Sequence, residues 1–144
     1  MIKLQSHTTS GASGPIQSAL VHFDFAHLEE YLQPIRNHLR SNANLVRNRF
    51  REVGLETTWY QTNSAFFFLL EFVRTPYFRR ICQSPADKSD YSEKICQDLL
   101  KEASVALVPG KDFGRPNSAR MSLVIDKGPM SESLTKLLSF LTQE

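Results

Sequence analysis

Two short apolar runs, separated by turns that contain glycine and proline, lie toward the end of this 144-residue chain. Residues 105–108 are apolar and include two valines, and Pro109-Gly110 ends the run, which predicts a short strand. A second turn is expected at residues 114–116. The next run, residues 120–125, also has the pattern of a strand and begins with Arg120. The spacing restricts this part of the chain to two strands joined by turns.

The arginine at the start of the second strand has two interpretations. The planar guanidinium of Arg120 can donate two parallel hydrogen bonds to the oxygens of a carboxylate, and a neighbouring turn leaves room for such a ligand. The simpler interpretation is an arginine at a strand edge that lies on the protein surface. The spacing alone favours the surface position.

Composition limits the chain to about one domain and excludes several classes of function. With 41% hydrophobic residues and ten phenylalanines, 144 residues can bury a core. A net charge of +2 is too small to indicate a nucleic acid or an anionic membrane as partner. The sequence has no apolar run of membrane-spanning length and no signal-peptide core at its start. Cys82 and Cys96 form no Cys-x-x-Cys pair, so we expect reduced thiols in a cytoplasmic protein and no metal site.

Hydrophobic periodicity predicts the other elements. The helices are expected at residues 15–23, 27–53, 91–103 and 130–141. Two further strands are expected at residues 57–60 and 65–72, with a turn at residues 61–64, and the second strand is apolar enough for burial on both faces. Residues 73–89 are expected to form a loop. Helices on one face of a mostly antiparallel sheet make an α+β sandwich of two layers.

Proline, glycine and capping residues mark the expected helix ends. Pro34 should start a new helix or kink the long one, and Gly54 should end it. Asp90 is a plausible cap for the helix that follows it, and Asp126 or Ser131 should begin the last helix.

Basic residues gather in two places. Five arginines in residues 36–51 are expected to form the solvated side of an amphipathic helix, because acidic residues elsewhere balance them and no aromatic residues alternate with them to stack on bases. The pair Arg79-Arg80 has the charge to hold a phosphate, but exposed charge on a loop is the better interpretation.

Taken in order, the motifs resemble the C-terminal part of the class I/II, fold-type-I aminotransferases that use pyridoxal phosphate. That pattern runs from a late helix through an apolar strand, Pro-Gly and a Phe-Gly turn to a strand with Arg-x-Ser. The matching segments are Lys101–Val105, Val108–Gly110, Phe113-Gly114 and Arg120–Ser122, preceded by Ser64–Phe68, Leu45–Leu55 and residues 4–10 with Gln17. Two positions differ: Ser104 replaces the usual glycine, and Asn117 stands where a second turn glycine is common.

The resemblance implies a domain organisation and a role for Arg120. Residues 1–26 would be a remnant of the large domain, and residues 27–144 the C-terminal small domain. Arg120 would grip the α-carboxylate of the substrate, and the side chain near Phe66 could approach the active site, although core packing is the main expectation for these aromatics. The complete enzyme would use pyridoxal 5'-phosphate, act on amino acids and 2-oxo acids, and form a homodimer, with no nucleic-acid or membrane partner.

The resemblance also implies a catalytic lysine, which the sequence does not supply. Ser133-Leu134-Thr135-Lys136 matches the family's Ser-x-x-Lys letters but falls in the last helix, after the arginine strand, and is rejected. Lys3 has no cofactor motif around it, and no glycine-rich phosphate cup is present. Three hypotheses follow: the C-terminal part of an aminotransferase, inactive alone; a non-catalytic amino-acid-binding domain that uses Arg120; and a module that pairs with a full-length subunit.

Overall fold

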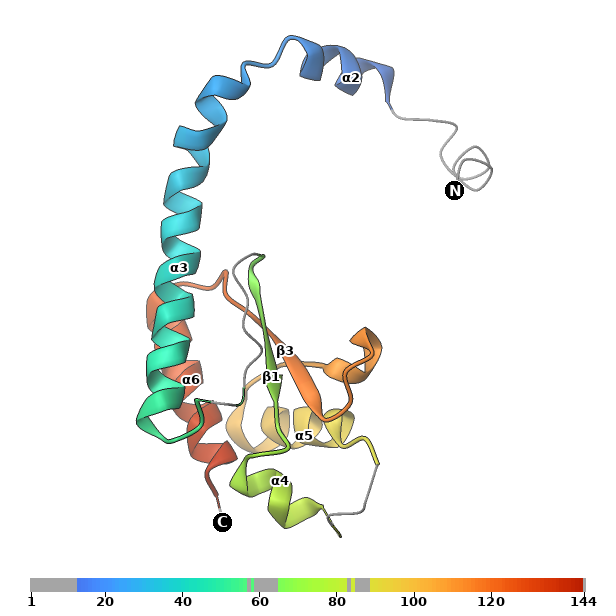
Figure 1. The fold of residues 1–144 in the computed structure, drawn as a ribbon, viewed down its shortest axis with the longest axis vertical. Helices are drawn as coiled ribbons and strands as arrows, with labels where there is room; N and C mark the ends of the chain where they lie inside the picture. Colours follow the sequence, from blue (N-terminus) through green and yellow to red (C-terminus); the bar gives the residue numbers. More distant parts are fainter. Residues whose placement is uncertain (1–12, 57, 59–64, 83, 85–88, 144) are drawn as a thin grey trace, which may run out of the picture. The chain divides into compact units, whose positions relative to one another are not determined.

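The computed structural model describes residues 13–56, 58, 65–82, 84 and 89–143 (Figure 1). The chain divides into two compact units, one up to Arg36 and one from Asn37 onward. The domain division after residue 26 that the resemblance implies stays a prediction. The motif at residues 4–10, Lys3, and most of the strand expected at 57–60 with its turn lie outside the described residues.

The first unit contains α2 (Gly14–Val21), the short 3-10 helix η1 (Phe25–His27) and the start of α3 (Leu28–Glu52). A proline occupies the first turn of α2, where a missing N–H costs nothing. The Asp24 carboxylate accepts a hydrogen bond from the Ala26 amide at 2.9 Å and begins η1. No residue of α2 is buried. The bounds of α2 confirm the helix predicted at 15–23, which ends two residues earlier than predicted.

The long helix α3 continues through Pro34, so of the two predicted alternatives, a new helix or a kink, the new helix does not occur. In the second unit it buries Ala43, Val46 and Phe50, which repeat every three or four residues. Its end follows the expected glycine: Gly54 has φ +72°, and the Leu55 amide donates back to the Phe50 carbonyl at 2.8 Å.

The second unit is built on a small antiparallel sheet of β1 (Phe67–Glu71), β2 (Val108–Pro109) and β3 (Ser118–Ser122). Its order is β1-β3-β2, so the last strand along the chain is the central one. Figure 1 shows β1 and β3 side by side, as their register from Phe67 opposite Ser122 to Glu71 opposite Ser118 requires. The α+β class with an antiparallel sheet is confirmed.

Four helices contribute much of the remaining core: the C-terminal half of α3, α4 (Pro76–Ile81), α5 (Ser92–Asp98) and α6 (Lys127–Leu141). The chain continues from α5 into a π-helical turn, η2 (Leu99–Ala103). The largest fully buried side chains include Phe50, Phe68, Phe72 and Phe140, each of which contributes roughly 1.5–3 kcal/mol by leaving water. Asp126 precedes the first residue of α6, as one of the two sequence alternatives predicted.

The structure corrects two expectations about elements. Residues 73–89 are not all loop, because α4 forms within them: Thr75 accepts a hydrogen bond from the Phe78 amide at 3.2 Å, and Pro76 begins the helix. Of the strand expected at residues 105–108, only Val108 is in a strand, because β2 consists of Val108 and Pro109. The strand expected at 65–72 is confirmed in its centre, as β1.

A buried amide ties α3 to the segment between β3 and α6. Asn42 is completely buried, and its Nδ2 donates to the carbonyl oxygens of Leu123 at 2.9 Å and Ile125 at 2.8 Å. His38 Nε2 also lies 3.1 Å from the Ile125 oxygen and 3.3 Å from Asn42 Nδ2.

Asn42→Ala is expected to lower the free energy of unfolding by about 1–3 kcal/mol, because it removes a donor from two carbonyls and leaves the buried Leu123 oxygen without its amide partner. Urea unfolding followed by circular dichroism measures the change. The matched control is Asn44→Ala at an exposed position of the same helix, where a change within about 0.5 kcal/mol is expected. Equal effects of the two variants would contradict the assignment.

Candidate functional site

The sheet has one face in the core and one face open. Side chains alternate along a strand, and Phe68 and Leu70 of β1 lie with Ala119 and Met121 of β3 on the core face. The alternate positions, among them Phe67, Leu69, Arg120 and Ser122, are half-buried and share the other face. This second face carries the candidate site.

Arg120 lies in the middle of the central strand, not at its start as the sequence suggested. Its backbone partners are Leu69 on one side and Val108 on the other. A residue in this position has its backbone fixed by neighbours on both sides, so the side chain leaves the sheet from a well-defined point. The prediction of an arginine at a strand edge is therefore wrong, because β3 begins two residues earlier and pairs with both other strands.

Two aromatic rings hold the guanidinium of Arg120. The Cζ atom lies 4.2 Å from the centroid of the Phe67 ring and 4.6 Å from the centroid of the Phe113 ring. These are cation–π distances, and each contact of this kind contributes on the order of 0.5–1 kcal/mol where solvent is present. Phe67 comes from β1, and Phe113 from the 3-10 helix η3 (Gly110–Phe113), so rings from two different segments restrict one side chain.

Within the described part of the chain, Arg120 makes no hydrogen bond or ion pair. It is half-buried, and aromatic rings accept none of the strong in-plane hydrogen bonds that its N–H groups can donate. A guanidinium held by rings, with its donors unused by these residues, can receive a carboxylate through two parallel hydrogen bonds.

The turn that carries Phe113 is packed closely onto the start of β3. A Cβ on Gly110 would lie 1.9 Å from Ser118 Oγ and 2.5 Å from the Arg115 carbonyl oxygen, so only glycine fits there. Gly114 ends η3 with φ +69°, a conformation that favours glycine. These two glycines explain the Pro-Gly and Phe-Gly letters of the sequence in physical terms.

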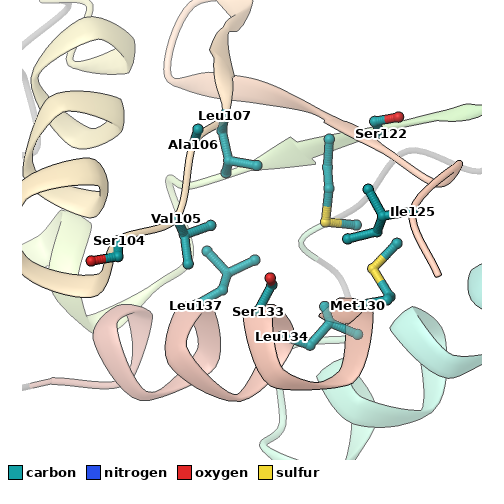
Figure 2. Close-up of a pocket in the computed structure, with 11 residues that line it drawn as sticks. Ser104, Val105, Ala106, Leu107, Ser122, Ile125, Met130, Ser133, Leu134 and Leu137 are labelled. Atoms are coloured by element: carbon teal, nitrogen blue, oxygen red, sulfur yellow. The ribbon is translucent and has the colours of Figure 1, made fainter. Parts of the chain in front are cut away.

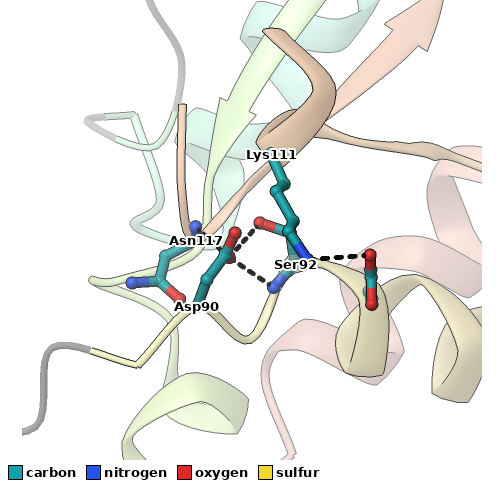
Figure 3. A network of polar contacts seen from close by, with 5 residues as sticks. Asp90, Ser92, Lys111 and Asn117 are labelled. Atoms are coloured by element: carbon teal, nitrogen blue, oxygen red, sulfur yellow. Dashed lines mark hydrogen bonds and ion pairs between the residues drawn. The ribbon is translucent and has the colours of Figure 1, made fainter. Parts of the chain in front are cut away.

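A polar network joins the same corner to the N-terminus of α5 (Figure 3). One carboxylate oxygen of Asp90 accepts hydrogen bonds from the Asn117 amide at 2.9 Å, the Ser92 amide at 2.9 Å and Ser92 Oγ at 2.5 Å. The N-cap of α5 is Tyr91, whose side chain makes no capping hydrogen bond, so the predicted cap at Asp90 is one residue too early. Asp90 still accepts from the amide of Ser92, the first residue of the helix. Lys111 donates to Glu93 beside this network at 3.2 Å.

The same contacts favour the charged form of Asp90. Its partial burial by itself would raise the pKa, but the hydrogen bonds from Asn117 and Ser92 and the charge of Lys111 outweigh that effect. The pKa of Asp90 is therefore held below its ordinary value.

Asp90→Asn is expected to reveal this lowered pKa through acid unfolding. The carboxylate stabilises the fold above the ordinary Asp pKa of about 3.9, and that contribution is lost as the pH falls through the lower folded-state value. At neutral pH the free energy of unfolding of the wild-type chain should be higher than that of the variant by about 1 kcal/mol or less, since Asp90 is exposed. This difference should shrink toward zero in acid. Urea midpoints from pH 7 to pH 3 measure it, and a difference that grows in acid would contradict it.

A separate pocket lies between β3 and α6 (Figure 2). It has a volume of about 150 Å³ and is lined mainly by apolar side chains, with Met121, Met130 and Leu137 among them. Because Met121 and Arg120 are neighbours on one strand, their side chains point to opposite faces. The pocket is therefore distinct from the arginine site.

The lysines of the described residues are engaged or exposed. Lys94, Lys111 and Lys136 pair with carboxylates of Asp98, Glu93 and Glu132. Lys101 and Lys127 are exposed. Lys136, rejected above on its position in the sequence, lies on the exposed side of α6 and pairs with Glu132 at 2.9 Å.

Sequence reasoning singled out Arg120 as a candidate carboxylate-binding residue, but not the two rings that contact its guanidinium. The resemblance allowed a side chain near Phe66 to approach the active site, with core packing as the main expectation. Phe66 itself is 46% exposed, and its neighbour Phe67 contacts the guanidinium. In the sequence, Phe113 stands out only as part of the Phe-Gly turn motif. Alternation along β1 could have indicated Phe67, because it lies one strand away on the face that Arg120 shares.

A small antiparallel sheet with helices on one face and an arginine on the other defines an α+β domain with a candidate carboxylate site. The family model for class I and II aminotransferases matches residues 1–137. The chain therefore belongs to this aminotransferase family, whose members use pyridoxal phosphate.

Two characterised relatives are similar over most of the chain. A tyrosine aminotransferase of Caenorhabditis elegans is 28% identical over 113 residues, which are 78% of this chain and 21% of the relative. An aspartate aminotransferase of Thermotoga maritima is 27% identical over 139 residues, which are 96% of this chain and 31% of the relative. The chain thus spans between a fifth and a third of the length of these relatives.

Solved structures agree with the fold. The crystal structure of the Thermotoga maritima aspartate aminotransferase superimposes with a TM-score of 0.64 at 25% identity, covering 98% of this chain and 32% of that one. A mutant aspartate aminotransferase of Thermus thermophilus gives a TM-score of 0.70 at 19% identity, covering 96% and 34%. The second likeness concerns the fold alone.

None of the described helices is both long and apolar enough to cross a membrane.

Proposed function

We propose that this chain forms the part of a pyridoxal-phosphate-dependent aminotransferase that binds the α-carboxylate of amino-acid and 2-oxo-acid substrates through Arg120. The observation that carries this proposal is the guanidinium held between Phe67 and Phe113 on the open face of the sheet. The family match supports the reaction class, and the distances to the two rings support the residue.

The described residues do not fit the cofactor itself. A catalytic lysine must reach the cofactor as a free amine, whereas three of the described lysines are in ion pairs and the other two are exposed on the surface. We therefore assign to the described residues the binding and orientation of the substrate and no proton transfer. Holding the carboxylate fixes one end of the substrate, which is how a binding group helps to align a reacting bond.

The chain alone is then expected to be inactive. Incubation with pyridoxal phosphate, reduction with borohydride and mass spectrometry should find no pyridoxyl group at a unique lysine, and no amino-group transfer should be measurable. A single modified lysine together with turnover would overturn this part of the proposal.

A non-catalytic amino-acid-binding module is the second candidate, because Arg120 and the two rings that contact it all belong to this chain. Calorimetry of the isolated chain with amino acids and 2-oxo acids separates the two. Submillimolar binding without any cofactor favours the module, whereas binding only after addition of a pyridoxal-containing subunit favours the enzyme part.

The partner and the compartment follow from the same proposal. The family resemblance supports a homodimer of the complete enzyme, and the free thiols of Cys82 and Cys96 are in keeping with a reducing, cytoplasmic location. Co-purification of a pyridoxal-containing protein with the tagged chain would identify a separate subunit.

A further inference from the structure

We propose that Asp90 and Asn117 form a clamp that positions Arg120 and Phe113 for carboxylate binding. The inference rests on the proposed function of Arg120 and names residues that act through it. Neither clamp residue contacts the guanidinium; their effect is on the backbone from which Arg120 and Phe113 project.

Asn117 has every polar group engaged. Its amide donates to Asp90 Oδ1 at 2.9 Å and its carbonyl accepts from the Phe72 amide at 2.9 Å. In the side chain, Oδ1 accepts from the Tyr91 amide at 2.8 Å and Nδ2 donates to the Ser89 carbonyl at 3.3 Å. One residue therefore connects β1, the segment before α5 and the start of β3.

The backbone of Asn117 explains why an asparagine serves here. Its φ of +54° lies in the left-handed region, which glycine adopts freely and asparagine tolerates better than most residues. Glycine would allow the turn but would lose the two hydrogen bonds that the Asn117 side chain makes to Tyr91 and Ser89. The asparagine combines the turn with the connection to α5.

The clamp reaches Arg120 through a short, restricted backbone. Ser118, the first residue of β3, donates its amide to Ser92 Oγ at 3.3 Å, and its own Oγ donates to the Arg115 carbonyl at 2.6 Å. Arg120 is the second residue after Ser118 on the same strand. The bond from Phe72 to Asn117 continues the pairing of β1 with β3, so it also fixes the register that brings Phe67 to the guanidinium.

The clamp acts on Phe113 as well. Gly110, at the start of η3, lies against Ser118 so closely that a Cβ would overlap its Oγ. The turn that presents Phe113 is therefore packed on the residue that follows Asn117. A shift at this corner would move the arginine and one of its two rings relative to each other.

The chain offers a matched control in Ser104. This residue also has a left-handed backbone, with φ +55°, and also replaces a glycine of the family pattern. Unlike Asn117, its hydroxyl makes no hydrogen bond within the described part of the chain. Ser104→Gly should keep the left-handed turn, remove its energetic cost and change nothing at Arg120. Asn117→Gly should also keep its turn, but it should remove the side-chain hydrogen bonds that form the clamp.

The experiment uses the full chain and two readouts. The first is the NMR chemical shift of the Arg120 Nε proton, which is sensitive to the ring currents of Phe67 and Phe113. The resonance is assigned by its disappearance in Arg120→Lys. The second is the calorimetric affinity for pyruvate as a probe 2-oxo acid. In Asn117→Gly, and in Asp90→Ala as a second variant, the proton should move toward its position in Phe113→Ala, and pyruvate should bind about three- to tenfold more weakly.

The outcomes separate the two proposals. If Asn117→Gly and Asp90→Ala keep the wild-type proton shift while remaining folded, the clamp is refuted. If both shift the proton and Ser104→Gly does not, the clamp is supported. If the wild-type chain binds no pyruvate in the presence or absence of a cofactor-bearing subunit, the proposed function fails, while the proton shift still decides the clamp. Loss of folding in Asn117→Gly alone leaves the decision to Asp90→Ala.

Discussion

Arg120→Lys is expected to weaken the binding of 2-oxo acids and amino acids by about 10- to 100-fold, which corresponds to the roughly 1.5–3 kcal/mol of a hydrogen bond to a charged group. Lysine keeps the positive charge but has a single ammonium group in place of the planar fork, so it loses the second parallel hydrogen bond. It also loses the flat surface that lies between Phe67 and Phe113. In a complete enzyme the same change should raise KM.

The measurement is calorimetric titration at constant ionic strength, with two controls. Arg40→Lys at an exposed position of α3 should leave the affinity unchanged. A ligand whose carboxylate is replaced by an amide, such as pyruvamide in place of pyruvate, should bind weakly to wild type and variant alike. Equal pyruvate affinity of wild type and Arg120→Lys would show that the guanidinium is not the carboxylate site.

Phe68→Ala is expected to lower the free energy of unfolding by about 3–5 kcal/mol. Phe68 is completely buried on the core face of β1, opposite Met121, and the Arg47 guanidinium lies 5.3 Å from its ring centroid. Removing the ring leaves a cavity that the surrounding side chains fill only in part. The loss should exceed that of any single contact on the open face of the sheet.

The two residues that precede Phe68 in the sequence provide matched controls for this prediction. Phe66→Ala, at a side chain that is 46% exposed, should cost about 1 kcal/mol or less. Phe67→Ala should act chiefly on Arg120, because its ring lies on the guanidinium. Urea unfolding and pyruvate titration of the three variants should therefore separate stability from binding. A small stability effect of Phe68→Ala, or an equally large one of Phe66→Ala, would contradict the assignment of faces.

Residues with strong local preferences were predictable. Gly54 ends α3 because a left-handed turn depends on the residue itself. Asp126 is the N-cap of α6 as predicted, although its side chain makes no capping hydrogen bond. The helix α4 shows the limit of such signals. Pro76 can break a helix or begin one, and in the structure it begins α4. Thr75 caps this helix, and Tyr77 packs on Phe140 of α6 with 4.2 Å between the ring centroids.

The position of Arg120 could be predicted only in part. The residue type and its neighbours suggested a carboxylate-binding group, and the resemblance strengthened that suggestion. The sequence placed it at the start of a strand, whereas pairing with β1 on one side and β2 on the other extends β3 and makes it central. Strand pairing joins segments about fifty residues apart in the chain, and no local pattern contains that information.

By itself, the sequence determined where the chain must turn, which side chains are apolar enough to be buried, and which family it resembles. Each of these depends on the chemistry of a residue and its near neighbours. The tertiary structure alone decided that Phe67 and Phe113 face Arg120, and that Asn117 connects the arginine strand to α5. These contacts join distant segments, and their positions follow from how the sheet and helices share one core.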